Sequence, residues 1–162
     1  MKCVECGGAM RVASRTHQYA ESGLPNVILR GVEVRKCAKC DTQEVGIPNI
    51  AGLHACLARL IVGRSSAMTR QEFRFLRQFL GHSSQDFAKL LRVTPETVSR
   101  WQTGRLAIPR PVELLVRLLV ARSQPRIDYT NEMLAKLRPQ PSHPPRLAVR
   151  LRHGSWEAAR AA

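Results

Sequence analysis

The sequence lacks a long uninterrupted apolar run. Its longest apolar stretch, residues 112–121, is broken by Glu113 and Arg117, whereas a membrane-spanning helix needs about 20 consecutive apolar residues. The first residues, Met1, Lys2 and Cys3, do not open the apolar core of a secretory signal either. We therefore expect a cytoplasmic protein with no membrane partner.

Acidic residues are scarce as well. The 162 residues include 26 Lys and Arg against 12 Asp and Glu, a net charge of +14. Residues 1–50 carry 7 basic and 5 acidic groups, residues 51–124 carry 12 and 4, and residues 125–162 carry 7 and 3. Such a positive field attracts polyanions, which favours a nucleic-acid partner bound by the middle of the chain. Charge alone does not distinguish DNA from RNA or from an anionic membrane surface.

No catalytic set is visible. The five histidines are scattered, and the sequence shows no serine–histidine–aspartate set, carboxylate pair or glycine-rich phosphate loop. His17 and His54 are expected to be ordinary polar residues and not metal ligands. We therefore expect a protein that is not an enzyme, and we keep a zinc-dependent redox or nucleic-acid-processing enzyme as the remote alternative.

Residues 84–104, SQDFAKLLRVTPETVSRWQTG, have the pattern of a helix-turn-helix. Ala88 is small where two helices must cross, and the apolar residues recur at the spacing of inward-facing helix positions: Phe87, Leu91, Val93, Val98 and Trp101. Thr94 is suited to cap the second helix, and Pro95 to occupy its first position. Glu96 and Arg100 then share the exposed face that a recognition helix uses to read base edges.

The pattern predicts a set of DNA-contacting residues around this second helix. They are Ser84, Gln85, Thr94, Glu96, Thr97, Ser99, Arg100 and, in the following loop, Arg105. The expected target is double-stranded DNA with a palindromic operator. The alternatives are a helical bundle that binds no nucleic acid and a simple surface pair between Glu96 and Arg100, which would contribute only about 0.2–0.5 kcal/mol.

Four of the five cysteines form two CxxC pairs, Cys3 with Cys6 and Cys37 with Cys40. Disulfides are disfavoured in the cytoplasm, so such pairs call for a metal or a redox explanation. Two separated pairs can supply the four thiolates of a closed, structural zinc site, so one Zn²⁺ per chain is expected. A thioredoxin-like redox motif and an iron–sulfur cluster fit the spacing less well. Cys56 lies in an apolar helical pattern and is expected to be a core residue.

Both modules resemble known families. The run TPETVSRW followed by a threonine and a glycine is similar to Xre/Cro-type helix-turn-helix proteins, and MKCVECGGAM with the second knuckle after Gly31, Val34 and Lys36 resembles the zinc-binding domain of MqsA-type (YgiT-type) antitoxins. The resemblance covers residues 1 to about 122. Gln102 departs from it, since relatives usually carry Glu there. The resemblance implies a homodimeric regulator that represses its own operon and binds a cognate toxin through residues 1–62; a stand-alone Xre-type regulator is the alternative.

The predicted fold is mainly α, with a small zinc-ribbon-like α+β module before an Xre/Cro-type helical domain. The expected parts are a zinc module (1–48), a connecting helix and hinge (49–68), the helix-turn-helix domain (69–138) and a disordered basic tail (139–162). The hinge is placed at the flexible break Gly63–Ala67, and a capping box of Thr69 and Glu72 is expected to open the next helix. Arg70, Arg74 and Arg77 would form its solvated or phosphate-contacting face. The tail is expected to be disordered because it holds four prolines within seven residues and basic side chains.

Overall fold

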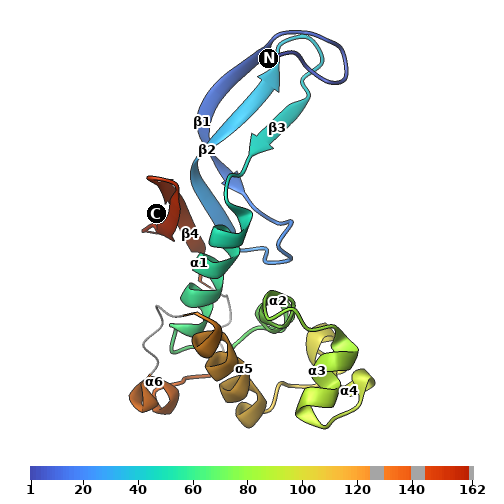
Figure 1. Ribbon diagram of the computed structural model, residues 1–162, viewed down its shortest axis with the longest axis vertical. Helices are drawn as coiled ribbons and strands as arrows, with labels where there is room; N and C mark the ends of the chain where they lie inside the picture. Colours follow the sequence, from blue (N-terminus) through green and yellow to red (C-terminus); the bar gives the residue numbers. More distant parts are fainter. Residues whose placement is uncertain (125–129, 140–144, 161–162) are drawn as a thin grey trace.

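A computed structural model describes residues 1–124, 130–139 and 145–160. Figure 1 shows an elongated molecule with a sheet at one end and a group of helices at the other, and helix α1 leads from the sheet into the helices. No described helix is long and apolar enough to span a bilayer. The elements in chain order are β1 (Met10–Gln18), β2 (Val27–Cys37), β3 (Gln43–Gly46), α1 (Ile50–Val62), α2 (Arg70–Phe79), α3 (Ser84–Leu91), α4 (Pro95–Thr103), α5 (Arg110–Ser123), α6 (Asn131–Ala135), β4 (Leu147–Arg152) and β5 (Ser155–Ala158).

The sheet is built around β2, the longest strand. β1 runs antiparallel to it along its whole length, from Met10 opposite Cys37 to Gln18 opposite Ile28. The other side of β2 is shared, since β3 pairs with its second half and β4 lies parallel to its first half. β5 then completes the sheet as a hairpin with β4. The chain is thus mixed α and β, and the prediction of a mainly α fold is right only for its middle.

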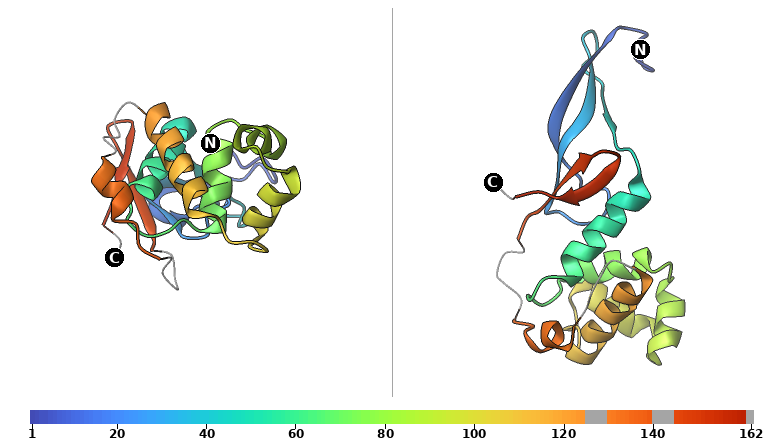
Figure 2. Two further views of the ribbon diagram at one scale, coloured as in Figure 1. Left: turned by 90° about the horizontal axis from the view of Figure 1, so that it is seen from below. Right: turned by 60° about the vertical axis from the view of Figure 1, so that its left-hand side comes forward.

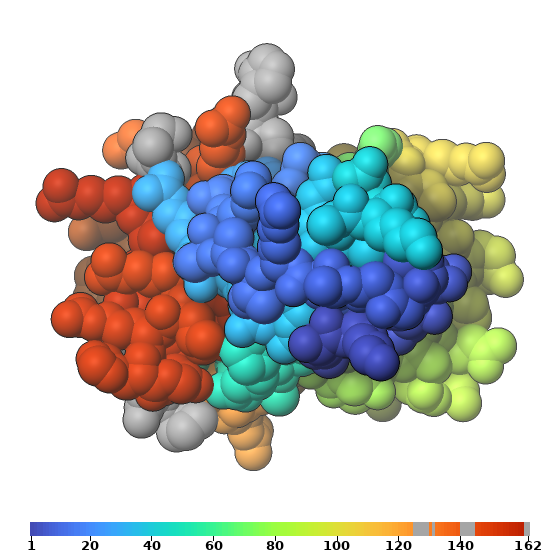
Figure 3. Space-filling view, turned by 90° about the horizontal axis from the view of Figure 1, so that it is seen from above, coloured from blue at the N-terminus to red at the C-terminus, as the bar shows by residue number. Residues whose placement is uncertain are grey.

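The predicted disordered tail is wrong for residues 145–160, which return to the sheet (Figure 2). Leu147 and Val149 are buried against β2, and Trp156 is buried with its indole Nε1–H donating to Pro48 O at 2.9 Å. Seen from above, this hairpin lies on one side of the N-terminal strands and the segment of α3 and α4 lies on the other (Figure 3). The prolines stop a helix without preventing a strand, and the apolar residues among the arginines pack on the sheet. Residues 140–144, 161 and 162 lie outside the described part of the chain.

Helix α1 packs on the sheet through its apolar face. Its inward side chains are fully buried in one core with Leu24 and Leu29 of the N-terminal part of the sheet, residues 1–48, called the sheet module below. These side chains are Leu53, Leu57 and Ile61. Cys56 is 3% exposed within this core, which confirms its assignment as a core residue. The Asn49 side chain caps the helix by accepting from Gly52 N–H. One core therefore includes both the sheet and the helix that leads to the second part of the molecule.

Helices α2 to α5 form the helix-turn-helix region around three aromatic rings. Phe73 of α2 meets Phe87 of α3 and Trp101 of α4 edge-to-face, at centroid distances of 5.8 and 5.9 Å. Ala88 is buried as expected of a residue at a close helix crossing. The predicted capping box of Thr69 and Glu72 is present. These aromatic pairs fix α3 and α4 relative to α2.

The segment predicted to be a flexible hinge, residues 63–67, is instead held by α5. Arg117 is fully buried, and its guanidinium donates to the carbonyls of Val62, Arg64 and Ser66 at 2.7–2.8 Å. Arg138 N–H donates to Ser65 O, and Ala67 N–H donates to Arg138 O. Each of these carbonyls accepts a hydrogen bond from Arg117 or Arg138, so the expected flexible break is a hydrogen-bonded segment and not a free loop.

Candidate metal centre and nucleic-acid interface

The four cysteines of the two CxxC pairs meet at the end of the sheet opposite the β1–β2 turn, where β1 begins and β2 ends. Cys3 and Cys6 lie in the turn before β1, Cys37 ends β2, and Cys40 lies in the turn that follows. Their Sγ atoms all lie within 4.8 Å of one another, with Cys3–Cys40 at 3.6 Å and Cys6–Cys37 at 3.5 Å. Four thiolates at about 2.3 Å from a tetrahedral ion would be about 3.8 Å apart, so the arrangement can hold one metal ion.

Backbone geometry shapes this cluster. Gly7 has φ +67°, and its N–H donates to Cys3 O in the first knuckle. A Cβ on Gly8 would lie 3.2 Å from the sulfurs of both Cys6 and Cys37, so a larger residue there would press on the ligands. Gly7 is therefore favoured by its positive φ and Gly8 by its close approach to the two sulfurs.

The thiols of the cluster differ in acidity. The amides of Lys39 and Cys40 lower the pKa of Cys37, and the Thr42 hydroxyl lowers that of Cys40. The Gly8 amide also lowers the pKa of Cys6, but its neighbouring thiols outweigh this effect and raise it to about 12. Four thiolates this close repel one another unless a cation lies between them, which is the electrostatic reason to expect a bound cation.

The second candidate site surrounds helix α4. Thr94 caps the helix by accepting from Thr97 N–H at 3.2 Å, and Pro95 occupies its first turn, both as predicted. Glu96, Ser99 and Arg100 are exposed and, with Pro95 and Arg105, line a shallow hollow of ≈460 Å³. The predicted contact residues Glu96, Ser99, Arg100 and Arg105 are thus brought together on one surface.

Several of the remaining predicted contact residues make hydrogen bonds within the protein. The hydroxyl of Thr97 lies 3.1 Å from that of Thr94. Ser84 Oγ accepts from Gln102 Nε2 at 3.3 Å, while Gln85 is exposed at the start of α3. Gln102 also accepts from Arg77, which is buried and donates to His82 O. Arg77 is therefore a structural residue, and its expected place on a solvated face is wrong.

Glu96 and Arg100 are free to contact a ligand. No ion pair joins them in the described part of the chain. The Glu96 amide and the Thr94 hydroxyl, with a smaller contribution from Arg100, lower the pKa of the Glu96 carboxyl. The carboxylate is thus charged at neutral pH and can accept a hydrogen bond from a base amino group.

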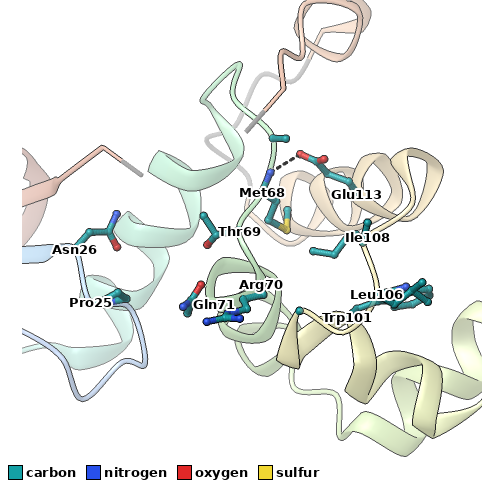
Figure 4. A pocket seen from close by; sticks show the side chains of 13 residues that line it. Pro25, Asn26, Met68, Thr69, Arg70, Gln71, Trp101, Leu106, Ile108 and Glu113 are labelled. Carbon is teal, nitrogen blue, oxygen red and sulfur yellow. Dashed lines mark hydrogen bonds between the residues drawn. The ribbon is translucent and has the colours of Figure 1, made fainter. Parts of the chain in front are cut away.

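Sequence reasoning missed a buried ionic network behind this surface. Arg117 donates to Glu113, and Glu113 also accepts from Met68 N–H at 3.0 Å (Figure 4). Arg64 pairs with Glu72, which in turn accepts from Thr69 N–H. The sequence did contain a signal of this network, because Glu113 and Arg117 lie one turn apart in an otherwise apolar helix. Charged residues on a buried helix are expected to be paired.

A hollow of ≈670 Å³ separates the sheet module from the helices. Figure 4 shows Pro25 and Asn26 on its sheet side and Arg70, Leu106 and Ile108 on its helical side. Arg70 donates across part of it to Thr103 O at 3.2 Å. The hollow therefore lies beside the loop that carries Arg105.

Comparison of the chain with protein-family models, with curated proteins and with solved structures gives no match.

Proposed function

We propose that the protein is a non-enzymatic, sequence-specific DNA-binding transcriptional regulator. The observation that carries this proposal is α4, a short capped helix whose face of Glu96, Ser99 and Arg100 is open to solvent. Its opposite side, with Val98 and Trp101, is buried against α2 and α3. A helix held in this way can enter the major groove with its first turns toward base edges.

The charge distribution supports DNA as the ligand. Residues 51–124 carry 12 basic against 4 acidic side chains, and of these cations Arg77 and Arg117 are buried in structural contacts. Arg70, Arg74, Arg92 and Arg105 are exposed around the same helices. Cations around a recognition helix contact phosphates and set the register of the protein on the duplex.

We infer that the protein binds a palindromic operator as a homodimer. On α5 the side chains of Leu115 and Leu118 are 39% and 43% exposed, although Val116 and Val120 of the same helix are fully buried. Two copies that bury these leucines against each other would present two recognition helices related by a two-fold axis. This dimer gives the exposed leucines a partner.

The metal proposed for the cysteine cluster is one structural Zn²⁺. Four thiolates form a soft, closed ligand set that suits zinc and leaves no open position for water. The ion would stabilise the tip of the sheet module and take no part in a reaction. This assignment fits a regulator better than an enzyme.

The most specific form of the proposal is an MqsA-like antitoxin that represses its own operon and uses the sheet module to bind a cognate toxin. A stand-alone Xre-type regulator with the same DNA-binding helices is the second candidate. The sheet module favours the first, because its tip lies away from α4 (Figure 1) and stays accessible to a second partner when α4 is on DNA. Co-purification of a neighbouring-gene product through residues 1–62 would separate the two candidates.

Selection of bound sequences from a random pool of double-stranded DNA tests the central proposal. The full-length, metal-loaded protein should enrich a palindrome whose half-sites are spaced by whole helical turns, because the spacing reflects the two-fold symmetry of the dimer. Enrichment of one unrepeated half-site would contradict the dimer but keep DNA reading. A pool that shows no sequence enrichment would refute the regulator.

A further inference from the structure

One face of the β1–β2–β3 sheet carries a basic groove. Arg11 lies opposite Lys36, and Ala13 lies opposite Val34, so these side chains share a face with Arg15. Together with Asp41 they line a hollow of ≈490 Å³ whose floor is the apolar pair Ala13 and Val34. We call this the basic groove.

The positive charge of the groove is only partly neutralised. Lys36 pairs with Asp41 at 2.9 Å, whereas Arg11 and Arg15 are exposed and form no ion pair with another described residue. On the opposite face of the sheet Arg35 is paired with Glu33. The groove therefore presents two arginines that have no ion-pair partner among the described residues, on one face of residues 1–50, which carry 7 basic and 5 acidic groups in all.

The groove runs beside an open sheet edge. β1 ends the described sheet, with β2 as its only strand partner. Ala9 O accepts from Ala38 on the β2 side, whereas Met10 N–H donates to Met1 O on the other side. Because backbone groups alternate along a strand, those of Val12 and Ser14 face outward. Lys2 bridges Ala9 at the start of this edge, while Val12 beyond it is 58% exposed. A further strand therefore has access to the edge from Val12 onward.

We propose that an extended acidic segment of a protein partner adds to β1 as a strand and places its carboxylates in the basic groove. Residues two apart on a strand are about 6.8 Å apart, so a segment with the pattern acid–x–apolar–x–acid would face Arg15, Ala13 and Arg11 in turn. Main-chain hydrogen bonds would give affinity and the arginines specificity. The inference rests on the proposed binding of a protein partner by the sheet module and describes how that partner would bind.

Two other occupants fit less well. A second copy of β1 in antiparallel pairing would bring Arg11 and Arg15 toward like charges, which is unfavourable. A single-stranded nucleic acid needs aromatic side chains for base stacking, and Tyr19 is the only aromatic residue among residues 1–72; it is buried. Charge and the absence of a stacking platform therefore favour an acidic peptide.

The test measures the affinity of a fluorescein-labelled peptide, Thr-Glu-Thr-Val-Thr-Glu-Thr, for the full-length zinc-loaded protein by fluorescence anisotropy. We expect the double variant Arg11→Glu/Arg15→Glu to bind it at least about tenfold more weakly. The composition-matched peptide Thr-Thr-Glu-Glu-Thr-Val-Thr should bind wild-type protein as weakly as that variant does. Methylation of the peptide nitrogens that face β1 should weaken binding about tenfold, whereas methylation of the alternate nitrogens should not.

The matched control is Lys136→Glu/Arg152→Glu, which makes the same charge change at exposed positions outside the basic groove and outside the helices proposed to contact DNA. Equal loss in both double variants would overturn the proposal, because binding would then follow net charge alone. The proposal would also be overturned if the Arg11/Arg15 variant bound the peptide as wild-type protein does but bound a thymidine oligonucleotide more weakly. The groove would then be a nucleic-acid site. Unchanged zinc content and an unchanged circular dichroism spectrum verify the fold of each variant. Operator affinity, measured in parallel, separates this proposal from the proposed DNA binding. A variant that loses peptide binding and keeps operator binding shows that the groove binds the peptide and takes no part in DNA binding.

Discussion

The Arg117 guanidinium donates from both Nε and Nη2 to a single carboxylate oxygen of Glu113, one turn earlier in α5, at 3.0 and 2.8 Å. The same guanidinium binds three carbonyls of the segment between α1 and α2. Both side chains are buried. The pair therefore joins α5 to the segment that follows α1, the helix that packs on the sheet.

Removing this cation should strongly destabilise the protein. Arg117→Met leaves the Glu113 carboxylate and three carbonyls without a buried donor, so we expect a loss of about 3–5 kcal/mol in the free energy of unfolding. Urea denaturation followed by circular dichroism measures it. Arg122→Met, five residues later in α5 and exposed, should change stability by no more than about 0.5 kcal/mol. Similar effects in the two variants would show that the network does not hold the segment.

Zinc binding should depend on the four clustered cysteines and not on the fifth. Cys37→Ser is expected to lose the bound ion, while Cys56→Ser should retain one equivalent even though Cys56 is in the core. Elemental analysis of protein purified without chelator measures the metal. Since α1 packs on the sheet away from the tip (Figure 1), the helical circular dichroism signal should survive in Cys37→Ser. Full zinc retention in that variant would refute the ligand set.

Base reading should depend more on Arg100 than on Arg105. Arg100→Ala should weaken operator binding by about 1–3 kcal/mol and relax the preference at one position of each half-site. If Arg105 contacts only phosphate, as proposed, Arg105→Ala should weaken binding to all sequences equally and reduce the salt slope by about one unit. Binding assays with the operator and with random DNA at several salt concentrations distinguish the two effects. Unchanged affinity and preference in a folded Arg100→Ala protein would contradict base reading by this side chain.

The C-terminal hairpin should contribute to global stability. Trp156→Ala removes a buried ring and its hydrogen bond to Pro48, so a loss of about 3–5 kcal/mol is expected. Differential scanning calorimetry of the full chain measures the shift in melting temperature. The exposed residue Arg152, on the adjoining strand β4, provides the control as Arg152→Ala. A melting temperature unaffected by the Trp156 change would indicate that the hairpin is not docked.

Acid should weaken the contact between α1 and α2 through His54. Burial lowers the pKa of this imidazole, which lies 3.1 Å from the Tyr19 hydroxyl and edge-on to Phe75. The imidazole of the unfolded chain therefore binds a proton more tightly than that of the folded protein. The contribution of neutral His54 to the free energy of unfolding is full above the unfolded pKa of about 6.5 and declines as the pH falls below it. His54→Gln should flatten the decrease in unfolding free energy between about pH 7.5 and 5. An unchanged pH dependence would exclude His54 as its source.

Local chemistry explains why parts of the structure could be predicted from sequence. Thr94 and Pro95 specify where α4 begins, since a cap and a first-turn proline act within one turn of helix. Likewise the two CxxC pairs were identifiable because four thiols in this spacing have few other uses in a reducing compartment. The structure brings those sulfurs together, while zinc and the DNA contacts remain predictions.

Long-range pairing explains what the sequence did not reveal. The strand around Val149 pairs with Leu29, and its apolar residues among arginines resemble a solvated tail unless that partner is known. Similarly, Gly63–Ala67 has the composition of a flexible loop, and its order depends on Arg117, a residue more than 50 positions away. Propensity and composition contain no information about such partners.

The pairing of β4 with β2 also affects the order in which parts of the protein can fold during synthesis. Val27 pairs with Leu147, so the sheet is complete only after the entire helix-turn-helix has been synthesised. Contacts between residues so far apart in sequence form slowly, whereas the local contacts of α3 and α4 form quickly. On the ribosome, α3 and α4 should therefore acquire their structure before the sheet, which begins earlier in the sequence, is complete.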